Sequence, residues 1–212
     1  MAARGRPRCF DRTSALERAM EVFWERGYEG ASLSDLTAAM EIASPSLYAA
    51  FGSKEALFRE SVTHYSQTDG SGLWQSLDSQ PTAREAVASL LKASAEASTQ
   101  PNKPTGCFLV LAMANCAPEN AEVQNELRDR RNFLGDLVRL RLDRGVADGD
   151  LPPGTDTRAL SAYFITVMQG MSLRARDGGT RAELLDVAGY AMAAWPGGIR
   201  AERGAELAAH PL

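Results

Sequence analysis

Two stretches near the start of the chain hold side chains suited to contact phosphates and base edges. The stretch RGRPR at 4–8 places three guanidinium groups, Arg4, Arg6 and Arg8, within five residues. The stretch SPSLYAAFGSK at 44–54 places hydroxyls, a tyrosine and a lysine around small alanines. Guanidinium, ammonium and hydroxyl groups bind phosphate oxygens, and extended arginines fit a narrow A·T-rich minor groove. These residue types predict contacts to double-stranded DNA.

Groups suited to catalysis or metal binding are scarce by comparison. The two histidines and three cysteines of the chain are His64, His210, Cys9, Cys107 and Cys116. They lack zinc-site spacing, and they form no Cys-His pair or Ser-His-Asp set that the sequence supports. The glycine-containing segment RARDGGT at 174–180 lacks the preceding strand and the spacing of a phosphate-binding loop. We therefore predict no catalytic residue, no metal site, no cofactor and no enzymatic activity.

The composition is that of an ordinary globular protein. Of the 212 residues, 44% are hydrophobic and 24% charged, with a net charge of −4. No apolar run approaches the ~18–20 residues of a membrane helix. The basic N-terminus lacks the apolar stretch of a secretion signal. An odd number of cysteines does not favour a disulfide framework, so we expect a cytoplasmic protein with no membrane contact.

The apolar pattern predicts an all-α chain of about nine helices, because no alternating strand pattern bounded by turns is present. In the first helix Leu16, Met20 and Phe23 recur on one face, and Gly27 follows it as a stop signal. Gln67–Gly72 is expected to be a break or a loosened helix. The expected helices are 13–26, 32–40, 44–52, 53–65, 82–98, 105–117, 119–146, 156–175 and 181–195.

The third of these helices is short and begins with a capping serine and a proline, Ser44 and Pro45. A helix, a brief turn and a second short helix together describe a helix-turn-helix, in which the second helix enters the DNA major groove. Leu47 and Phe51 are expected to point inward, while small outer residues allow the backbone to approach the bases. The predicted DNA contacts, besides the three arginines, are Ser32, Ser44, Pro45, Ser46, Tyr48, Ala49, Ala50 and Lys54.

Residues 5–65 resemble the DNA-binding domain of the tetracycline-repressor (TetR) family of bacterial transcriptional regulators. The resemblance rests on "GRPRCFDRTSALERAMEVFWERGYEGASLSDLTAAM" followed by "SPSLYAAFGSKEALF". It implies a homodimer that binds a palindromic operator and releases it when a small molecule, unidentified here, enters the C-terminal part. Repression is the favoured mode of regulation.

The chain departs from the family pattern in its turn and in its recognition helix. Glu41 stands where glycine is usual, and a left-handed conformation there costs roughly 1 kcal/mol. No Arg, Lys, Asn or Gln faces outward from residues 44–52, so the strongest bidentate base readers are missing. Base reading is therefore expected to depend on serine hydroxyls, alanine–thymine contacts, DNA shape and the arginines at 4–8.

These observations divide the chain into four parts. We expect a basic flexible arm at 1–12, a three-helix DNA-binding domain at 13–55, a helical effector-binding and dimerisation domain at 56–198 and a disordered tail at 199–212. The segment at 4–8 resembles an AT-hook peptide, which implies an arm in the minor groove; a disordered solubilising tail is the alternative.

Two sets of apolar residues are candidates for a ligand pocket and for a dimer interface, although each set fits a plain core as well. The pocket candidates are Cys107, Phe108, Met113, Phe133, Leu137, Tyr163 and Met168. The interface candidates are Leu160, Phe164, Val167, Met171, Leu184, Val187, Ala188, Ala191, Met192 and Trp195.

Cys107 has two interpretations. If Thr105 caps a helix at 105–117, Cys107 lies in its first turn, where the helix dipole favours a thiolate and suits a sensor of electrophiles or oxidants. The alternative is a small buried apolar side chain. Cys116 lies nine residues further, about 13.5 Å along a continuous helix, which is too far for a disulfide.

Two functions from different classes follow from the sequence. The first is a ligand-responsive transcriptional regulator. The second is an all-helical small-molecule binding or enzymatic protein whose helix-turn-helix only packs. Salt-sensitive duplex binding that Lys54→Ala weakens similarly across sequences is expected of the first alone.

Overall fold

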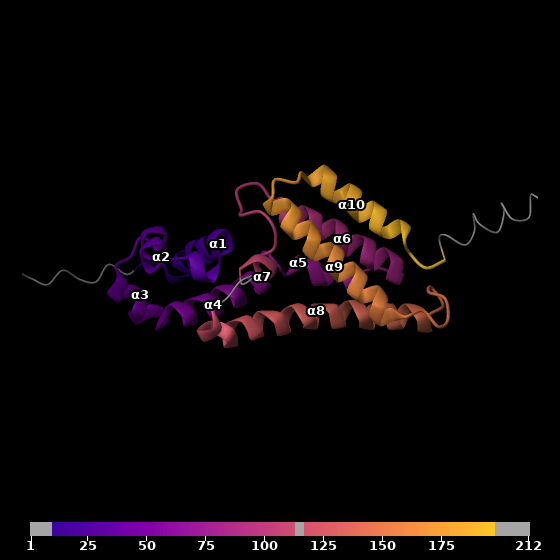
Figure 1. Cartoon of the computed structure of the whole chain (residues 1–212), viewed down its shortest axis with the longest axis horizontal. Helices are drawn as coiled ribbons and strands as arrows, with labels where there is room; N and C mark the ends of the chain where they lie inside the picture. The colour runs from indigo at the N-terminus through magenta and orange to yellow at the C-terminus, as the bar shows by residue number, and fades with distance from the viewer. Residues whose placement is uncertain (1–9, 113–116, 198–212) are drawn as a thin grey trace, which may run out of the picture.

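The computed structural model describes residues 10–112 and 117–197, and all of its regular structure in those ranges is helical. The all-α prediction is confirmed for this part of the chain. Figure 1 shows α1 to α3 at one end and the long α8 along one side of the body. The helices are α1 (Arg12–Gly30), α2 (Leu33–Met40), α3 (Ser44–Phe51), α4 (Lys54–Gln67), α5 (Gly72–Ser79), α6 (Ala83–Ser98), α7 (Phe108–Leu111), α8 (Ala121–Ala147), α9 (Thr157–Arg176) and α10 (Arg181–Ala193), with a 3₁₀ turn at Pro118–Asn120.

The first helix begins and breaks at residues that the sequence marks. The Asp11 carboxylate accepts hydrogen bonds from the backbone N–H groups of Thr13 and Ser14. Gly27 interrupts the helix with φ 72° and ψ 170°, and one further turn reaches Gly30. The predicted stop is confirmed, because a positive φ at this point requires glycine.

The helix-turn-helix forms as predicted, with one shift in register. Ser32 and Asp35 form the expected capping box of α2. Glu41 adopts the left-handed conformation, φ 56° and ψ 36°, that the turn requires. The N-cap of α3 is Ala43, so Ser44 lies inside the helix and does not cap it as predicted. Ala43 supplies the extended backbone at the cap.

The region after α4 contains a helix that the sequence reasoning missed. The break expected at 67–72 is present at 68–71, because Gln67 still belongs to α4 and Gly72 already belongs to α5. A hydrogen bond from the Gly70 N–H to the Tyr65 carbonyl at 2.8 Å closes it. The eight-residue α5 then follows where no helix was predicted. It packs chiefly against α6, so tertiary contact supports a segment whose local pattern is weak.

The predicted helix at 105–117 is wrong, because the described helix has only four residues and begins after Cys107. Gly106 explains the change, with φ 82° and a close approach to α9. A Cβ at this position would lie 2.7 Å from the Ser172 carbonyl oxygen, so only glycine fits. Thr105 does not cap the helix. Met113 and Cys116 lie outside the described residues.

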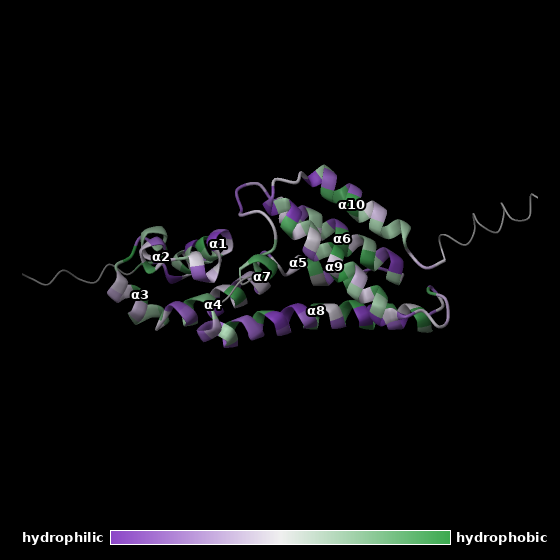
Figure 2. Cartoon of the chain, viewed as in Figure 1, coloured by the Kyte–Doolittle hydropathy of each residue, from purple (hydrophilic) through white to green (hydrophobic). Residues whose placement is uncertain are grey.

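The described side chains form two hydrophobic cores rather than one. The first joins α1 to α4 with α7 and the start of α8, and the second joins α5, α6, α9 and α10 with the rest of α8. In Figure 2, green apolar residues mark the helices around both cores, while α8 is largely purple along its length. The first core includes Leu16, Met20, Phe23, Trp24, Tyr28, Leu36, Leu47, Phe51, Phe58, Tyr65, Phe108 and Leu127. The second includes Leu77, Val87, Leu90, Leu91, Val138, Leu142, Phe164, Met171, Leu184, Ala188, Ala191 and Trp195.

Candidate DNA-binding surface and ligand pocket

The short α3 presents small side chains outward and buries two apolar ones. Leu47 and Phe51 lie in the first core, as predicted. Tyr48 is 46% exposed. The outward positions predicted for DNA contact are exposed or half-buried: Ser44, Pro45, Ser46, Tyr48, Ala49 and Ala50. This face is free of bulky aliphatic groups, so its backbone can come close to base edges.

Arg12 fixes the far end of α3, which the sequence reasoning did not anticipate. Its guanidinium lies 4.3 Å from the centre of the Phe51 ring and donates to the Ala50 carbonyl at 3.2 Å. It also forms an ion pair with Glu60 on α4. The pKa of Arg12 is raised mainly by its hydrogen bond to Glu60. These contacts position the recognition helix between α1 and α4.

The two other predicted contacts, Lys54 and Ser32, have partners inside the protein. The Lys54 ammonium lies 4.6 Å from the centre of the Tyr28 ring, and partial burial lowers its pKa while Glu29 acts in the opposite direction. The Ser32 hydroxyl donates to the Asp35 carboxylate at 2.6 Å. Lys54 stands at the N-terminus of α4, where backbone N–H groups also attract anions. Arg4, Arg6 and Arg8 lie outside the described residues.

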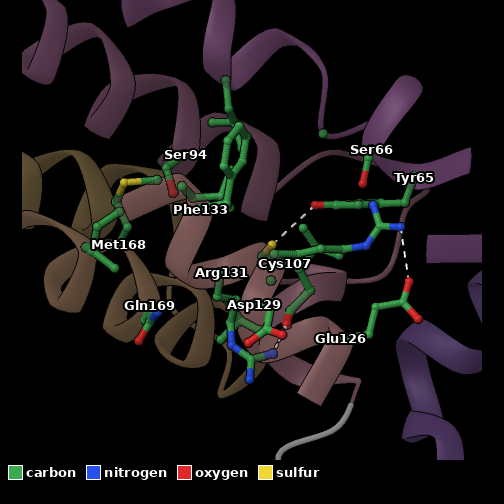
Figure 3. A pocket seen from close by; sticks show the side chains of 18 of the residues that line it. Tyr65, Ser66, Ser94, Cys107, Glu126, Asp129, Arg131, Phe133, Met168 and Gln169 are labelled. Atoms are coloured by element: carbon green, nitrogen blue, oxygen red, sulfur yellow. Dashed lines mark hydrogen bonds and ion pairs between the residues drawn. The ribbon is translucent and has the colours of Figure 1, made fainter. Parts of the chain in front are cut away.

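A cavity of about 780 Å³ lies where the two cores meet. Four of the predicted pocket residues, Cys107, Phe133, Leu137 and Met168, line it. Figure 3 shows Phe133 and Met168 on the side away from Tyr65 and Glu126. A volume of this size matches the pockets that hold small organic ligands.

Two predicted pocket residues lie elsewhere, and both assignments are corrected. Phe108 is fully buried, and its ring packs against Trp24, Phe58 and Tyr65 in the first core. Tyr163 is 40% exposed on the outer side of α9 and does not line the cavity. Helix periodicity identified apolar positions, but it could not assign them to core, cavity or surface.

Cys107 faces a tyrosine on the wall of the cavity. The Tyr65 hydroxyl donates to the Cys107 sulfur at 3.5 Å, as drawn in Figure 3. Burial raises the pKa of Tyr65 well above its usual range, and the neighbouring Cys107 adds to this effect. The Cys107 N–H donates to the Ser172 hydroxyl at 2.7 Å, which joins α7 to α9. The predicted position in the first turn of a long helix is wrong, so that argument for a reactive thiol is lost.

The remaining wall of the cavity carries charged side chains that the sequence reasoning missed. Arg59 pairs with Glu55 at 2.9 Å and with Glu126, and Arg130 pairs with Glu126 at 3.2 Å. Arg131 donates to the Leu109 carbonyl at 2.7 Å, and burial lowers its pKa. The spacing of Arg131, Leu134 and Leu137, every third residue on α8, was the available signal.

Most of the predicted interface residues lie inside the chain's own core. Val187 is 41% exposed, and Leu160, Val167 and Met192 are partly buried. The other apolar side chains exposed on α9 and α10 are Tyr163, Leu173 and Tyr190. The assignment is corrected for six buried residues, which support these helices from within: Phe164, Met171, Leu184, Ala188, Ala191 and Trp195.

Two further features bear on other classes of protein. Within residues 10–112 and 117–197, no group of three or more His, Cys, Asp or Glu side chains could hold a metal ion. The helices of the described ranges are each too short or too polar to cross a lipid bilayer.

A short helix whose outward side chains are mostly small, joined to a helical domain that contains a cavity, is typical of helix-turn-helix transcriptional regulators. The model of the bacterial regulatory proteins of the tetR family matches residues 15–61. A second model, the tetracyclin repressor-like C-terminal domain, matches residues 83–187. The chain belongs to the TetR family, as the resemblance predicted, and is a DNA-binding transcriptional regulator.

Relatives extend this likeness over nearly the whole chain. The HTH-type transcriptional repressor ComR of Escherichia coli strain K12 is 33% identical over 195 residues, which are 92% of this chain and 93% of ComR. A cysteine-substituted variant of the TetR family regulator CifR, solved with a 26-base-pair operator duplex, is 50% identical. It covers 90% of this chain and 100% of the CifR chain, with a TM-score of 0.86. A regulator from Chloroflexus aurantiacus, 20% identical with a TM-score of 0.73, shares the fold.

Proposed function

We propose that the chain is a homodimeric repressor that binds a palindromic operator and releases it when a small molecule occupies the cavity. The observation that carries this proposal is the exposed, small-residue face of α3 beside Lys54. The likeness to CifR, whose solved complex contains operator DNA, supports the same docking. Repression is supported by ComR and by BdcR of Escherichia coli, both named repressors.

Dimerisation places two copies of α3 on successive major grooves. One helix-turn-helix makes few contacts, and two half-sites about 34–36 Å apart double them. The apolar side chains exposed on α9 and α10, above all Val187 and Tyr190, supply a surface for a four-helix interface. Val187→Asp should therefore convert the dimer to a monomer in sedimentation and weaken operator binding.

Helix α4 connects the cavity to the DNA-binding surface. It begins at Lys54, beside α3, and its Tyr65 and Ser66 line the cavity. A ligand that displaces Tyr65 would therefore shift the helix that supports α3. Residues 13–55 would act on DNA, residues 56–198 would bind the effector and the second subunit, and the arginines at 4–8 would add minor-groove contacts. A regulator that acts on the bacterial chromosome works in the cytoplasm.

The decisive experiment is selection of bound fragments from a genomic duplex pool, followed by titration at several salt concentrations. The recovered site should be palindromic. Lys54→Ala should weaken binding to all duplexes similarly. If each Lys54 contacts one phosphate, the slope of log K against log salt should fall by about 1.8 per dimer.

The matched control is Lys92→Ala, since Lys92 is an exposed lysine on α6, far along the chain from α3. It should change neither the affinity nor the slope. A protein that stays monomeric and ignores duplexes in dilute salt would overturn the proposal. Deleting residues 2–8 should also weaken operator binding and lower the slope. If affinity and slope stay unchanged, the arginines at 4–8 do not contact DNA.

A further inference from the structure

The cavity has an apolar wall and a charged wall that meet along one face of α8. Leu134 and Leu137 from α8 and Ile165 and Met168 from α9 form the apolar wall. Arg131 stands at the end of the same α8 face, six residues before Leu137. At 1.5 Å per residue, this face extends about 9 Å from the charged end to the apolar one. The cavity is therefore shaped for a molecule with one polar end.

Among the described residues, Arg131 is the one guanidinium on this wall without an ion pair, while the carboxylate of Glu122, which also lines the cavity, acts on Arg59. Glu126 accepts from both Arg59 and Arg130, and Asp129 pairs with Arg128 at 3.0 Å. Among the described residues, no carboxylate lies within ion-pair distance of Arg131. Its contact at 2.7 Å is the neutral carbonyl of Leu109.

This guanidinium is also withdrawn from solvent. The Arg131 side chain is partly buried, and this burial lowers its pKa, although the group stays protonated. A partly desolvated cation without a counter-ion favours an anion more strongly than an exposed one does.

A second donor also lines the cavity. The Tyr65 hydroxyl is buried and donates to the Cys107 sulfur at 3.5 Å. Sulfur is a weak acceptor, so an oxyanion in the cavity would offer this hydroxyl a better partner. Tyr65 lies on α4, and such a switch would therefore reach the helix that supports α3.

We propose that the cavity binds an amphipathic anion, with its carboxylate on Arg131 and its hydrocarbon body against Leu134, Leu137 and Met168. The binding claim concerns the cavity itself. The claim that this anion is the effector rests on the function proposed above.

Titration of the full chain with hexanoate, octanoate and decanoate by calorimetry tests this inference, below the concentration at which each aggregates. If each added methylene becomes buried, Kd should fall about fourfold per methylene. Octan-1-ol, which keeps the chain and loses the charge, should bind about ten- to hundredfold more weakly than octanoate. Octylammonium should bind more weakly still.

Two substitutions at Arg131 and one control complete the test. Arg131→Gln should weaken octanoate binding about ten- to hundredfold and leave octan-1-ol unchanged, while Arg131→Lys should retain a preference for octanoate. Arg128→Gln removes an exposed arginine of the same helix that does not line the cavity, so it should change neither Kd.

The inference fails if octan-1-ol binds as tightly as octanoate, or if Arg131→Gln and Arg128→Gln behave alike. Operator titrations then separate it from the function proposed above. If octanoate binds through Arg131 but leaves operator affinity unchanged, the anion site stands and this anion's role as effector fails. If an uncharged molecule releases the operator and no carboxylate binds, the regulator stands and the anion site fails.

Discussion

The two hydrophobic cores differ in composition and in what they hold together. Aromatic rings dominate the first core. The ring centres of Phe58 and Phe108 lie 5.6 Å apart, and those of Tyr65 and Trp24 lie 4.9 Å apart. The second is built mainly of leucine and alanine from α6, α9 and α10. Large rings fill space between helices from separate parts of the chain, whereas small side chains let neighbouring helices pack closely.

This difference shows that packing does not follow the boundary at residue 55 that the sequence suggests. The first core includes Phe108 from α7 and Leu127 from α8, so the DNA-binding helices share their core with the segment beside the cavity. The cavity lies at the junction and is lined by Tyr65 and Leu109 from one core and by Leu137 and Met168, which pack against the other. A ligand there contacts both bodies.

The largest effect is expected from removing the ring that links α7 to the DNA-binding helices. Phe108→Ala should reduce the free energy of unfolding by about 3–5 kcal/mol, because Phe108 is fully buried. Urea denaturation at fixed protomer concentration measures it. Leu140→Ala, at a site 58% exposed on α8, should change stability by less than about 0.5 kcal/mol. A Phe108→Ala loss as small as the control's would show that the first core does not extend to α7.

A smaller effect is expected from replacing the arginine that joins the helices of the second core to those of the first. Arg176 on α9 donates to the carbonyls of Trp24 at 2.6 Å and Glu25 at 2.9 Å. Arg176→Ala should cost about 1.5–3 kcal/mol and accelerate hydrogen exchange at the end of α1. Arg174→Ala, on the same helix, removes only an exposed pair with Glu183 and should cost about 0–1 kcal/mol. Equal effects of the two changes would argue against this link.

The turn of the helix-turn-helix should tolerate glycine well. Glu41→Gly should raise the free energy of unfolding by up to about 1 kcal/mol, because it relieves a left-handed conformation at φ 56°. Loss of the exposed Arg18–Glu41 pair at 2.9 Å offsets little of this gain. Asn102→Gly, at φ 63° in the loop before α7, is the matched change. Thermal unfolding midpoints of both variants check this. Since asparagine accepts this conformation more readily than glutamate, Asn102→Gly should raise the midpoint less than Glu41→Gly does; a larger rise would contradict the argument.

The smallest expected effect is on the pH dependence of stability, and it comes from two exposed helix caps, one beside each core. The pKa of Asp35 is lowered mainly by the hydrogen bond from the Ser32 hydroxyl. The pKa of Glu183 is lowered mainly by the hydrogen bond from the Thr180 N–H. A lowered folded pKa gives stability that is present above the unfolded value, near 3.8 for Asp and 4.5 for Glu, and is lost as pH falls through the folded value.

Unfolding midpoints measured from pH 6 downward test this dependence. Asp35→Ala and Glu183→Ala should each flatten the decline of stability below these values, because each removes a group that takes up a proton on unfolding. Asp186→Ala, at an exposed residue of α10 that caps no helix, is the control. A decline that stays as steep in both cap variants would contradict the capping account.

Several helix ends and the helix-turn-helix were predictable because their determinants are local. Asp35 caps α2 three residues from Ser32, Gly27 breaks α1, and the αL conformation at Glu41 follows from the turn between two helices. The family resemblance also rests on this segment, and it led to the correct class of protein. The six buried interface candidates show the limit, since an apolar face of α9 or α10 reads the same whether it meets its own chain or a partner.

The sequence by itself determined an all-helical regulator with a DNA-binding N-terminal unit, since caps, glycine stops and apolar periods act over a few residues. Only the tertiary structure decided the length of α7, the division into two cores and the cavity. Gly106 prevents a helix from beginning at Thr105, because the turn needs a positive φ there and Ser172, 66 residues later, leaves no room for a side chain. Within the described ranges Arg131 has no counter-ion, because of how α4, α7 and α8 meet. Such contacts join residues far apart along the chain, and no local pattern records which side chains will face each other.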